Sequence, residues 1–512
     1  MKNWSAFARD AFSALGTAFL LIAPLLIIAS VRKYIPIPVF VFFGLWFFVF
    51  LFYFRSRQKS SGDFLSAYLF SIAVLTFIVA VWNIYDIGTL LKYPDTGVYV
   101  AQSKFGLLSR TFWSMKGGRP FVTPLIFKAF HQDLARINDF FIIIYLAATL
   151  FFIFVLTRFF PGVREKMAAG YIFLLLFLNQ NSISLWLSCG LSEIPSIVMT
   201  LLLFSVFGLL YIHREALNKR GRRSYAAIAA ITLVAVLFAS SRDSNVYFLP
   251  CLLPFFLLVF KRWKFRIILS FLIVLVFGAA KISADRTRRW ERPLQNVMQW
   301  RVLPDDRLRQ TFQNRYHLPK NEYVMPLAKN WHPRPRKIKK PLVAWIRKYG
   351  AKSYRNFLIT HPRYVLQEWR KAWDVIQEGM WILEKEPEYY ADPRVRPKRL
   401  NAVIFNFPGH VSFPLAILVA AFGLIFIKKN PLLFFASAHS FIVSLIAFHA
   451  DYVEVSRHCQ QASMTLKIAY LLSILSLYVA IKNGLLGKPT QPRENNGSVN
   501  KAAPKKTETI EK

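Results

Sequence analysis

The chain has 512 residues, of which 55% are hydrophobic and 16% aromatic, and its formal net charge is +39 at pH 7. The apolar residues fall in long blocks, which excludes an ordinary soluble globular protein and indicates a polytopic helical membrane protein. Because such a chain meets lipid phosphates first, the charge predicts an anionic membrane surface or anionic lipid as partner, and no nucleic acid. Three cysteines without CxxC or metal-ligand spacing predict no zinc or redox site.

Twelve apolar segments approach or exceed the length of about 20 residues that a membrane-spanning helix needs. We therefore predict an all-α polytopic membrane protein with about 12 transmembrane helices. The N-terminal segment does not end in a small-residue cleavage site, so we interpret it as a retained span and not as a signal peptide. The predicted spans are residues 12–31, 37–54, 64–85, 138–157, 168–187, 194–212, 225–240, 245–260, 265–282, 409–427, 431–450 and 464–482.

Lysine and arginine in the short connections predict the orientation, because cytoplasmic connections carry an excess of both. With the N-terminus inside, both chain ends are cytoplasmic and the stretches 86–137 and 283–408 lie outside. We predict a multi-pass plasma (inner) membrane protein whose active site faces the periplasm or the exterior. The positively charged cytoplasmic connections are residues 55–59, 158–166, 213–224, 261–264 and 428–429.

The predicted division of the chain follows from these spans. The stretch 283–408 is too polar to span and long enough to fold as a mixed, mainly α, extracytoplasmic domain. It has 27 Lys and Arg against 12 Asp and Glu between residues 285 and 400, and several tryptophans, so we expect it to contact headgroups or an anionic lipid. A charged external domain without lipid contact is the alternative. The predicted parts are a two-helix extension (1–63), a transmembrane core (64–282) with the first outer loop (86–137), the basic domain (283–408), a three-helix membrane segment (409–485) and a disordered cytoplasmic tail (486–512).

An aspartate stands in the first outer loop, in the stretch LLKYPDTGVYVAQSKF at residues 90–105. One interpretation is structural: Pro94 ends the preceding helix, and Asp95 caps the next one by accepting hydrogen bonds from its free amides. The other is functional, because a carboxylate at the rim of a membrane cavity can act as a general base. Two amphipathic helices are predicted in the same loop, at about 98–113 and 121–131.

Further ionisable residues occur at the outer ends of apolar segments, where their cost requires a reason. Glu193 lies in SCGLSEIPS, and Arg242 and Asp243 lie in ASSRDSNVYF. Glu193 could cap the next helix, and Arg242 and Asp243 could neutralise each other at a turn. Since the predicted topology puts these residues and Asp95 on one side, we expect a single outward-facing polar cavity, in which Glu193, Arg242 and Asp243 bind substrate.

The most polar of these segments is HADYVEVSRHCQQA, which contains Asp451, Glu454, Arg457 and His458. On one continuous helix their spacing of three to seven residues would place them on a shared face. Asp451 and Glu454 could then ligate a divalent ion, while Arg457 and His458 could hold a phosphate. A structural ion-pair cluster is the alternative.

Together these features resemble the GT-C superfamily of membrane glycosyltransferases, which use polyprenyl-phosphate-linked sugars. The features are the aspartate in an outer loop with two short amphipathic helices, the later SEIP and SRDSN motifs, and a large external domain after further spans. The stretch GRPFVTPLIFKAF at 118–130 is similar to the Gly/Pro-rich second half of the family's first loop. The resemblance is to members related to the dolichyl- or undecaprenyl-phosphate mannosyl- and arabinosyltransferases.

The resemblance implies that residues 64–282 form the family's seven-helix core, with Asp95 as the catalytic aspartate and Glu193 at the second acidic position. Two helices precede this core, and Asp95 has no adjacent acidic partner, which departs from the family pattern. We therefore expect no obligatory cofactor; a divalent cation such as Mg²⁺ or Mn²⁺ would be held by Asp451 and Glu454.

The expected reaction is transfer of a sugar from a polyprenyl-phosphate donor to a glycan, lipid or protein acceptor, with inversion. Asp95 would take the proton of the acceptor hydroxyl, and Arg242, Arg457 and His458 would meet the phosphate charge. One alternative is a multi-span transporter or flippase of a lipid-linked or anionic substrate, since charges within membrane segments also mark substrate paths. Another is a ligase or polymerase of glycans already assembled on lipid.

Overall fold

The computed structural model describes residues 92–114, 118–178, 189–218, 222–320, 340–377, 410–452 and 455–485, with residues 186 and 187 and isolated positions between 70 and 90. Within these ranges the chain is helical and forms no β-strand, which confirms the all-α prediction there. The predicted spans 12–31 and 37–54, most of 64–85, and the tail 486–512 lie outside the described residues.

Five described helices are long and apolar enough to cross a membrane. Helix α7, for example, begins where the Asp133 carboxylate accepts hydrogen bonds from the amides of Ala135 (3.0 Å) and Arg136 (3.3 Å). The length and apolar composition of these five helices support the membrane character expected from the sequence. The five are α7 (Leu134–Thr157), α9 (Glu193–Ile212), α13 (Trp263–Thr287), α24 (Pro431–Ala450) and the stretch Arg457–Lys482 of α25 (Val455–Leu485).

The other predicted spans in the described part of the chain correspond to shorter helices. The span predicted at 168–187 contains a helix that ends at Phe177, and the span predicted at 409–427 contains one of 13 residues. The described residues therefore contain five helices of full span length, and the total of twelve stays a prediction. The shorter elements are α8 (Val163–Phe177), α10 (Arg214–Leu217), α11 (Arg222–Ala239), η2 (Asp243–Leu252), α12 (Leu253–Val259) and α23 (Phe413–Ile425).

The span predicted at 245–260 is not one α-helix. Ten residues, Asp243–Leu252, form the 3₁₀ helix η2 with Pro250 inside it, and seven residues continue as α12. Proline has no amide hydrogen to donate, which interrupts an α-helical bonding pattern. A 3₁₀ helix rises about 2.0 Å per residue and an α-helix about 1.5 Å, so η2 and α12 together extend about 30 Å. That length matches the hydrocarbon core of a bilayer although the segment is short in residues.

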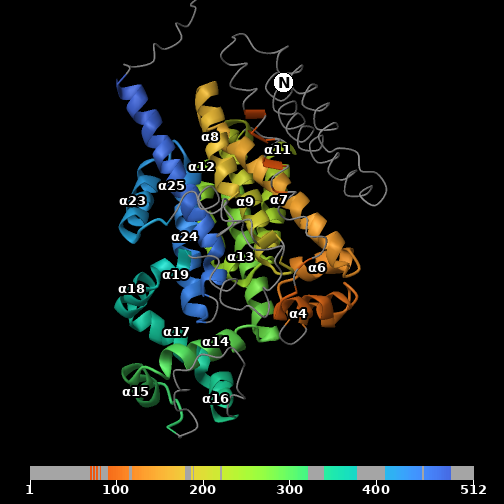
Figure 1. Cartoon of the computed structure of the whole chain (residues 1–512), viewed down its shortest axis with the longest axis vertical. Coiled ribbons are helices and arrows are strands. Elements are labelled where there is room, and N and C mark those ends of the chain that lie inside the picture. The colour runs from red at the N-terminus through yellow and green to blue at the C-terminus, as the bar shows by residue number, and fades with distance from the viewer. Residues whose placement is uncertain are drawn as a thin grey trace, which may run out of the picture.

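The long helices pack around one apolar core, to which α7, α9, α11, η2 and α24 all contribute. Figure 1 shows the first-loop helices at the same end of this bundle as the helices that follow α13. The first-loop helices are α4 (Pro94–Ser103), α5 (Arg110–Ser114) and α6 (Val122–Ala129). Those after α13 are α14 (Glu291–Val297), η3 (Met298–Val302), α15 (Asp306–Arg315), α16 (Lys340–Trp345), η5 (Ile346–Gly350), α17 (Ala351–Thr360), α18 (Pro362–Lys371) and α19 (Trp373–Gln377).

The helices after α13 have a separate hydrophobic core centred on Phe312 and Trp345. Trp345, Trp369 and Trp373 are 2–4% exposed. The latter two pack against Phe413 of α23, with ring centroids 5.6 and 5.2 Å away. The rings of these three tryptophans fill protein interiors and do not contact headgroups; the contact of the whole segment with lipid stays a prediction.

The predicted orientation can be tested with exposed residues at the two ends of the bundle. We expect a cysteine at Lys352 in α17 to react with an impermeant maleimide in intact cells, and a cysteine at Glu215 in α10 to react only after permeabilisation. The unaltered protein is the control, since Cys189 and Cys459 are buried and Cys251 is partly buried. Labelling in the opposite order would overturn the topology.

Candidate functional site

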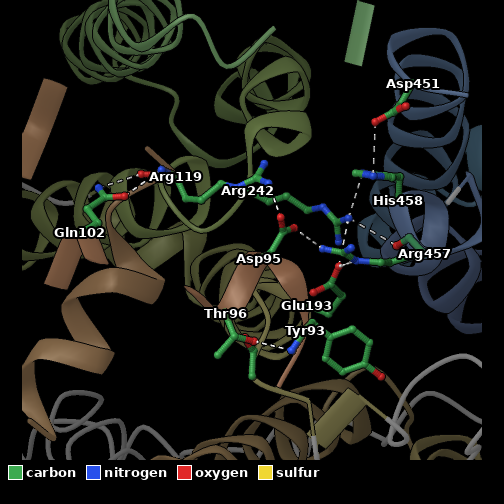
Figure 2. A network of polar contacts seen from close by, with 11 residues as sticks. Tyr93, Asp95, Thr96, Gln102, Arg119, Glu193, Arg242, Asp451, Arg457 and His458 are labelled. Atoms are coloured by element: carbon green, nitrogen blue, oxygen red, sulfur yellow. Dashed lines mark hydrogen bonds and ion pairs between the residues drawn. The ribbon is translucent and has the colours of Figure 1, made fainter. Parts of the chain in front are cut away.

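Charged side chains from distant parts of the chain meet at the end of the bundle that carries α4 and α6. Figure 2 shows them pointing toward one another from the first loop, the start of α9, the start of η2 and the start of α25. The structure thus brings together at least one residue from each of the polar segments noted in the sequence. The members of this cluster, called the charged cluster below, are Asp95, Arg119, Glu193, Arg242, Arg457 and His458.

Asp95 lies in the first turn of α4, but it is not the N-cap, which is Tyr93. The Tyr93 amide donates to Thr96 Oγ1 (2.9 Å), and the Thr96 hydroxyl donates to the carbonyl of Gly190 (2.9 Å), which fixes α4 against the segment before α9. The capping interpretation of Asp95 is therefore wrong. Its carboxylate instead accepts one bond from Arg119 and one from Arg457 Nη2 at 2.8 Å.

The two arginines dominate the electrostatics of Asp95. Burial alone would raise the pKa of its carboxyl group, but Arg457 and Arg119 together hold this pKa well below the ordinary range. The carboxylate is therefore ionised at physiological pH. A carboxylate of such low pKa is a weak base, so Asp95 becomes an effective one only if the arginines are drawn away from it.

Glu193 is the first residue of α9 and is 0% exposed. Its Oε1 atom accepts from Arg457 Nε at 2.7 Å and lies 3.3 Å from Arg242 Nη2. The N-cap of α9 is Ser192, so the capping interpretation of Glu193 is also wrong. Its position in the first turn still suits a negative charge, because the helix dipole is positive there.

Arg242 and Asp243 do not neutralise each other. Arg242 Nη2 donates to His458 Nδ1 at 3.2 Å, whereas Asp243 accepts from Arg289 Nε at 3.0 Å. Since Nδ1 of His458 accepts, the neutral tautomer with its proton on Nε2 fits, and this atom lies 3.6 Å from the Asp451 carboxylate. The structure thus places Arg242 in the charged cluster and Asp243 in a separate pair.

The segment from Asp451 to His458 is not one helix, so the predicted shared face is wrong. Helix α24 ends at Ala450, and Asp451 has an extended backbone. Its carboxylate accepts from the amide of Tyr452 at 2.7 Å, a local bond that competes with continuation of the helix. Arg457 and His458 reach the charged cluster from the start of the next helix instead, and Glu454 lies outside the described residues.

The charged cluster does not fit the divalent cation considered from sequence. Among the described residues no group of three or more His, Cys, Asp or Glu side chains could hold a metal ion. Asp95 and Glu193 are already bonded to guanidinium groups, which repel a cation. The predicted pair of Asp451 and Glu454 is not tested, because Glu454 is not described.

The charged cluster instead suits an anion. Arg119, Arg242 and Arg457 face two carboxylates, Asp95 and Glu193, which leaves one positive charge in excess among these five; Asp451, beyond His458, balances it only in the wider network. Arg119 Nε and Arg242 Nη1 are buried and have no partner among the described residues. Guanidinium groups with free N–H donors bind phosphate oxygens well.

Sequence reasoning missed Arg119, although it stands in the Gly/Pro-rich stretch already singled out. Its backbone is fixed by Gln102, whose Oε1 accepts from the Arg119 amide (2.8 Å) and whose Nε2 donates to the Arg119 carbonyl (3.1 Å). This pairing joins the two halves of the first loop. The neighbouring Pro120, which restricts the backbone of the residue before it, was the available signal.

Sequence reasoning also missed Asn296 and Arg301, which connect the helices after α13 to the end of α24 and to Asp451, beside the charged cluster. Asn296 Nδ2 donates to Asp451 at 2.9 Å, and Asp451 in turn lies beside His458. Arg301 Nη2 donates to the carbonyl of Phe448 at 2.9 Å, and its guanidinium lies 4.1 Å from the centre of the Phe448 ring. These contacts hold the end of α24 from which the chain continues to α25.

We expect Arg301→Met to lower the free energy of unfolding by about 2–4 kcal/mol, because a buried carbonyl loses a charged donor and an aromatic ring loses a cation. Unfolding of the purified protein in mixed micelles measures this. Arg307→Met is the matched control, since Arg307 is exposed in α15. Equal stability of the two variants would show that Arg301 does not hold the end of α24.

No protein-family model, curated protein or solved structure matches this chain. Its function therefore has to follow from the chemistry of the charged cluster and from the resemblance seen in its motifs.

Proposed function

We propose that this protein is an integral membrane glycosyltransferase that moves a sugar from a polyprenyl-phosphate donor to an extracytoplasmic acceptor. The observation that carries this proposal is a group of three arginines around two carboxylates at one end of an apolar bundle: Arg242 and Arg457 are buried, Arg119 is half-buried, and Arg119 and Arg242 each have an unpaired N–H donor among the described residues. A lipid-linked phosphate brings an anion to this depth while its chain stays in the bilayer.

The arginines account for departure of the leaving group. The donor phosphodiester carries one negative charge, and it gains a second when the bond between the sugar carbon and the phosphate oxygen breaks. The electron pair of that bond passes to the phosphate oxygen, where Arg119, Arg242 and Arg457 oppose the new charge. Stabilisation of a charge that grows during the reaction accelerates the reaction itself.

Asp95 would act on the acceptor, by taking the proton of its hydroxyl group. The acceptor hydroxyl oxygen forms the new bond to the sugar carbon, and its proton passes to the Asp95 carboxylate. A single displacement of this kind inverts the anomeric centre. Before the donor binds, Asp95 is held by Arg119 and Arg457. A phosphate that takes over these arginines leaves Asp95 freer and more basic, so donor binding itself would prepare the base.

The proposal is tested with purified protein, polyprenyl-phosphate-linked hexoses and pentoses, and a membrane extract that supplies acceptors. We expect release of bare polyprenyl phosphate, measured by mass spectrometry, together with sugar incorporation into the extract. Turnover of lipid-diphosphate oligosaccharides alone would indicate a ligase instead. Movement of an intact sugar lipid between vesicle leaflets without cleavage would indicate a flippase. Either result would overturn the proposal.

A further inference from the structure

Two consecutive glutamines of α25, Gln460 and Gln461, are buried without partners. Each is 0% exposed, and none of their four side-chain nitrogen and oxygen atoms has a hydrogen-bond partner among the described residues. Buried polar groups in native proteins nearly always have partners, because leaving them unpaired is costly. The two amides therefore require a partner that the described residues do not provide.

Their position relates them to the charged cluster. Residues three and four positions apart on an α-helix lie over the same face, about one turn apart. Gln460 and Gln461 thus follow Arg457, which bonds Asp95 and Glu193, by one turn along α25. Because Arg457 stands near the start of α25, the glutamines lie one turn further into the apolar stretch of this helix.

Other buried polar side chains of α25 have partners. The hydroxyl of Thr465 donates to the carbonyl of Gln461 at 3.0 Å, and that of Ser473 donates to the carbonyl of Ala469 at 2.9 Å. Buried polarity is therefore satisfied locally at these positions. The two unsatisfied glutamines are the ones one turn from Arg457.

The chemistry of an amide identifies its ligand class. A glutamine side chain offers two donor hydrogens and one acceptor oxygen without charge, which matches a hydroxyl group that both donates and accepts. A polyprenyl chain has no such groups, and a phosphate has no need of neutral partners while arginines are near. A sugar joined to the phosphate carries several hydroxyls within about one helical turn of it.

We propose that Gln460 and Gln461 form the sugar subsite of the donor, beside the arginines that take its phosphate. This inference rests on the proposed function, since it assumes a phosphate-linked sugar as ligand. In this assignment the two glutamines recognise the sugar, and the arginines recognise the charge of the phosphate.

The test compares two probes on the full-length protein in detergent: bare polyprenyl phosphate, and a panel of hexoses and pentoses linked to the same polyprenyl phosphate. The variants are Gln460→Met and Gln461→Met, which keep side-chain length and remove the amide. We expect the unaltered protein to bind at least one sugar lipid more tightly than the bare lipid. Each variant should lose about fivefold to tenfold in affinity for that sugar lipid and keep its affinity for the bare lipid.

Ser473→Ala is the matched control, a buried polar change on the same helix that should leave both affinities unaltered. The thermal midpoints of the lipid-free Met variants should equal or exceed that of the unaltered protein, because removing an unpaired amide costs nothing. Lower midpoints, or equal losses for both probes, would assign the glutamines a structural role and overturn the inference.

The remaining outcomes separate this inference from the proposed function. If the unaltered protein prefers a sugar lipid and the Met variants keep that preference, the glutamines are not the subsite, and the proposed function stands. If the unaltered protein prefers no member of the panel over the bare lipid, the proposed function fails and the inference fails with it.

Discussion

An Asp95→Asn variant should turn over the sugar donor about 10²–10⁴-fold more slowly than the unaltered protein. Asparagine keeps the shape of the side chain but cannot take up the proton of the acceptor hydroxyl. Affinity for the donor should not fall, because the positive charge of Arg119 and Arg457 is no longer offset by Asp95. Turnover and donor binding, measured separately, distinguish loss of a base from loss of a binding residue.

This experiment needs a control for folding, because Asp95 takes part in two ion pairs. Asp95 offsets two guanidinium groups, and removing one partner of these partly buried ion pairs is destabilising. The double variant Asp95→Asn with Arg119→Gln removes one charge of each sign. We expect it to recover stability but not turnover. Full turnover in a well-folded Asp95→Asn variant would remove Asp95 from the reaction.

Arg457→Gln should have the largest effect on stability of any single change in the charged cluster. Arg457 bonds Asp95 through Nη2 and Glu193 through Nε, so its loss leaves two carboxylates without their shared partner. Breaking a buried pair of this kind costs about 3–5 kcal/mol. Donor affinity should fall by at least tenfold as well, since a charged hydrogen bond to phosphate is lost.

A double-mutant cycle separates the two effects of Arg457. Adding Glu193→Gln to Arg457→Gln restores the charge balance, so stability should return toward that of the unaltered protein. Donor affinity should stay low, because no guanidinium replaces the one removed. Arg457→Lys is the companion test: it keeps the charge, but a single ammonium group cannot bridge Asp95 and Glu193 as the planar fork does. Donor binding that recovers together with stability would remove Arg457 from phosphate recognition.

Much of the charged cluster could be predicted from sequence, because charge in an apolar chain is conspicuous. Asp95, Glu193, Arg242 and Arg457 each stand at the end of an apolar segment, and the pattern of Lys and Arg predicted that those ends share one side of the membrane. That these residues lie close together could be predicted without knowing how the helices pack. Which charges pair with each other could not: Asp243 adjoins Arg242 in sequence but bonds Arg289 in the fold.

Other features could not be read from local patterns. The spacing from Asp451 to His458 suits a helix face, yet a side-chain bond to the backbone of Tyr452 accompanies the end of the helix there. In sequence, nothing distinguishes Arg119 from the other cations of the first loop. In the structure, Gln102 fixes its backbone and its side chain bonds Asp95. The span at 245–260 looked short because residue counts assume an α-helical rise, which η2 does not have.

The bond between Arg457 and Asp95 joins residues 362 positions apart in the chain. During synthesis, α9 and its buried Glu193 enter the membrane long before α25 exists. Until α25 arrives, Glu193 has only Arg242 of the two cations that lie beside it in the finished protein, and a buried charge that has lost a partner is costly. A polypeptide that stops short of α25 therefore leaves Asp95 and Glu193 each without one of their cations, so we expect it to be less stable than the finished protein and to be degraded faster.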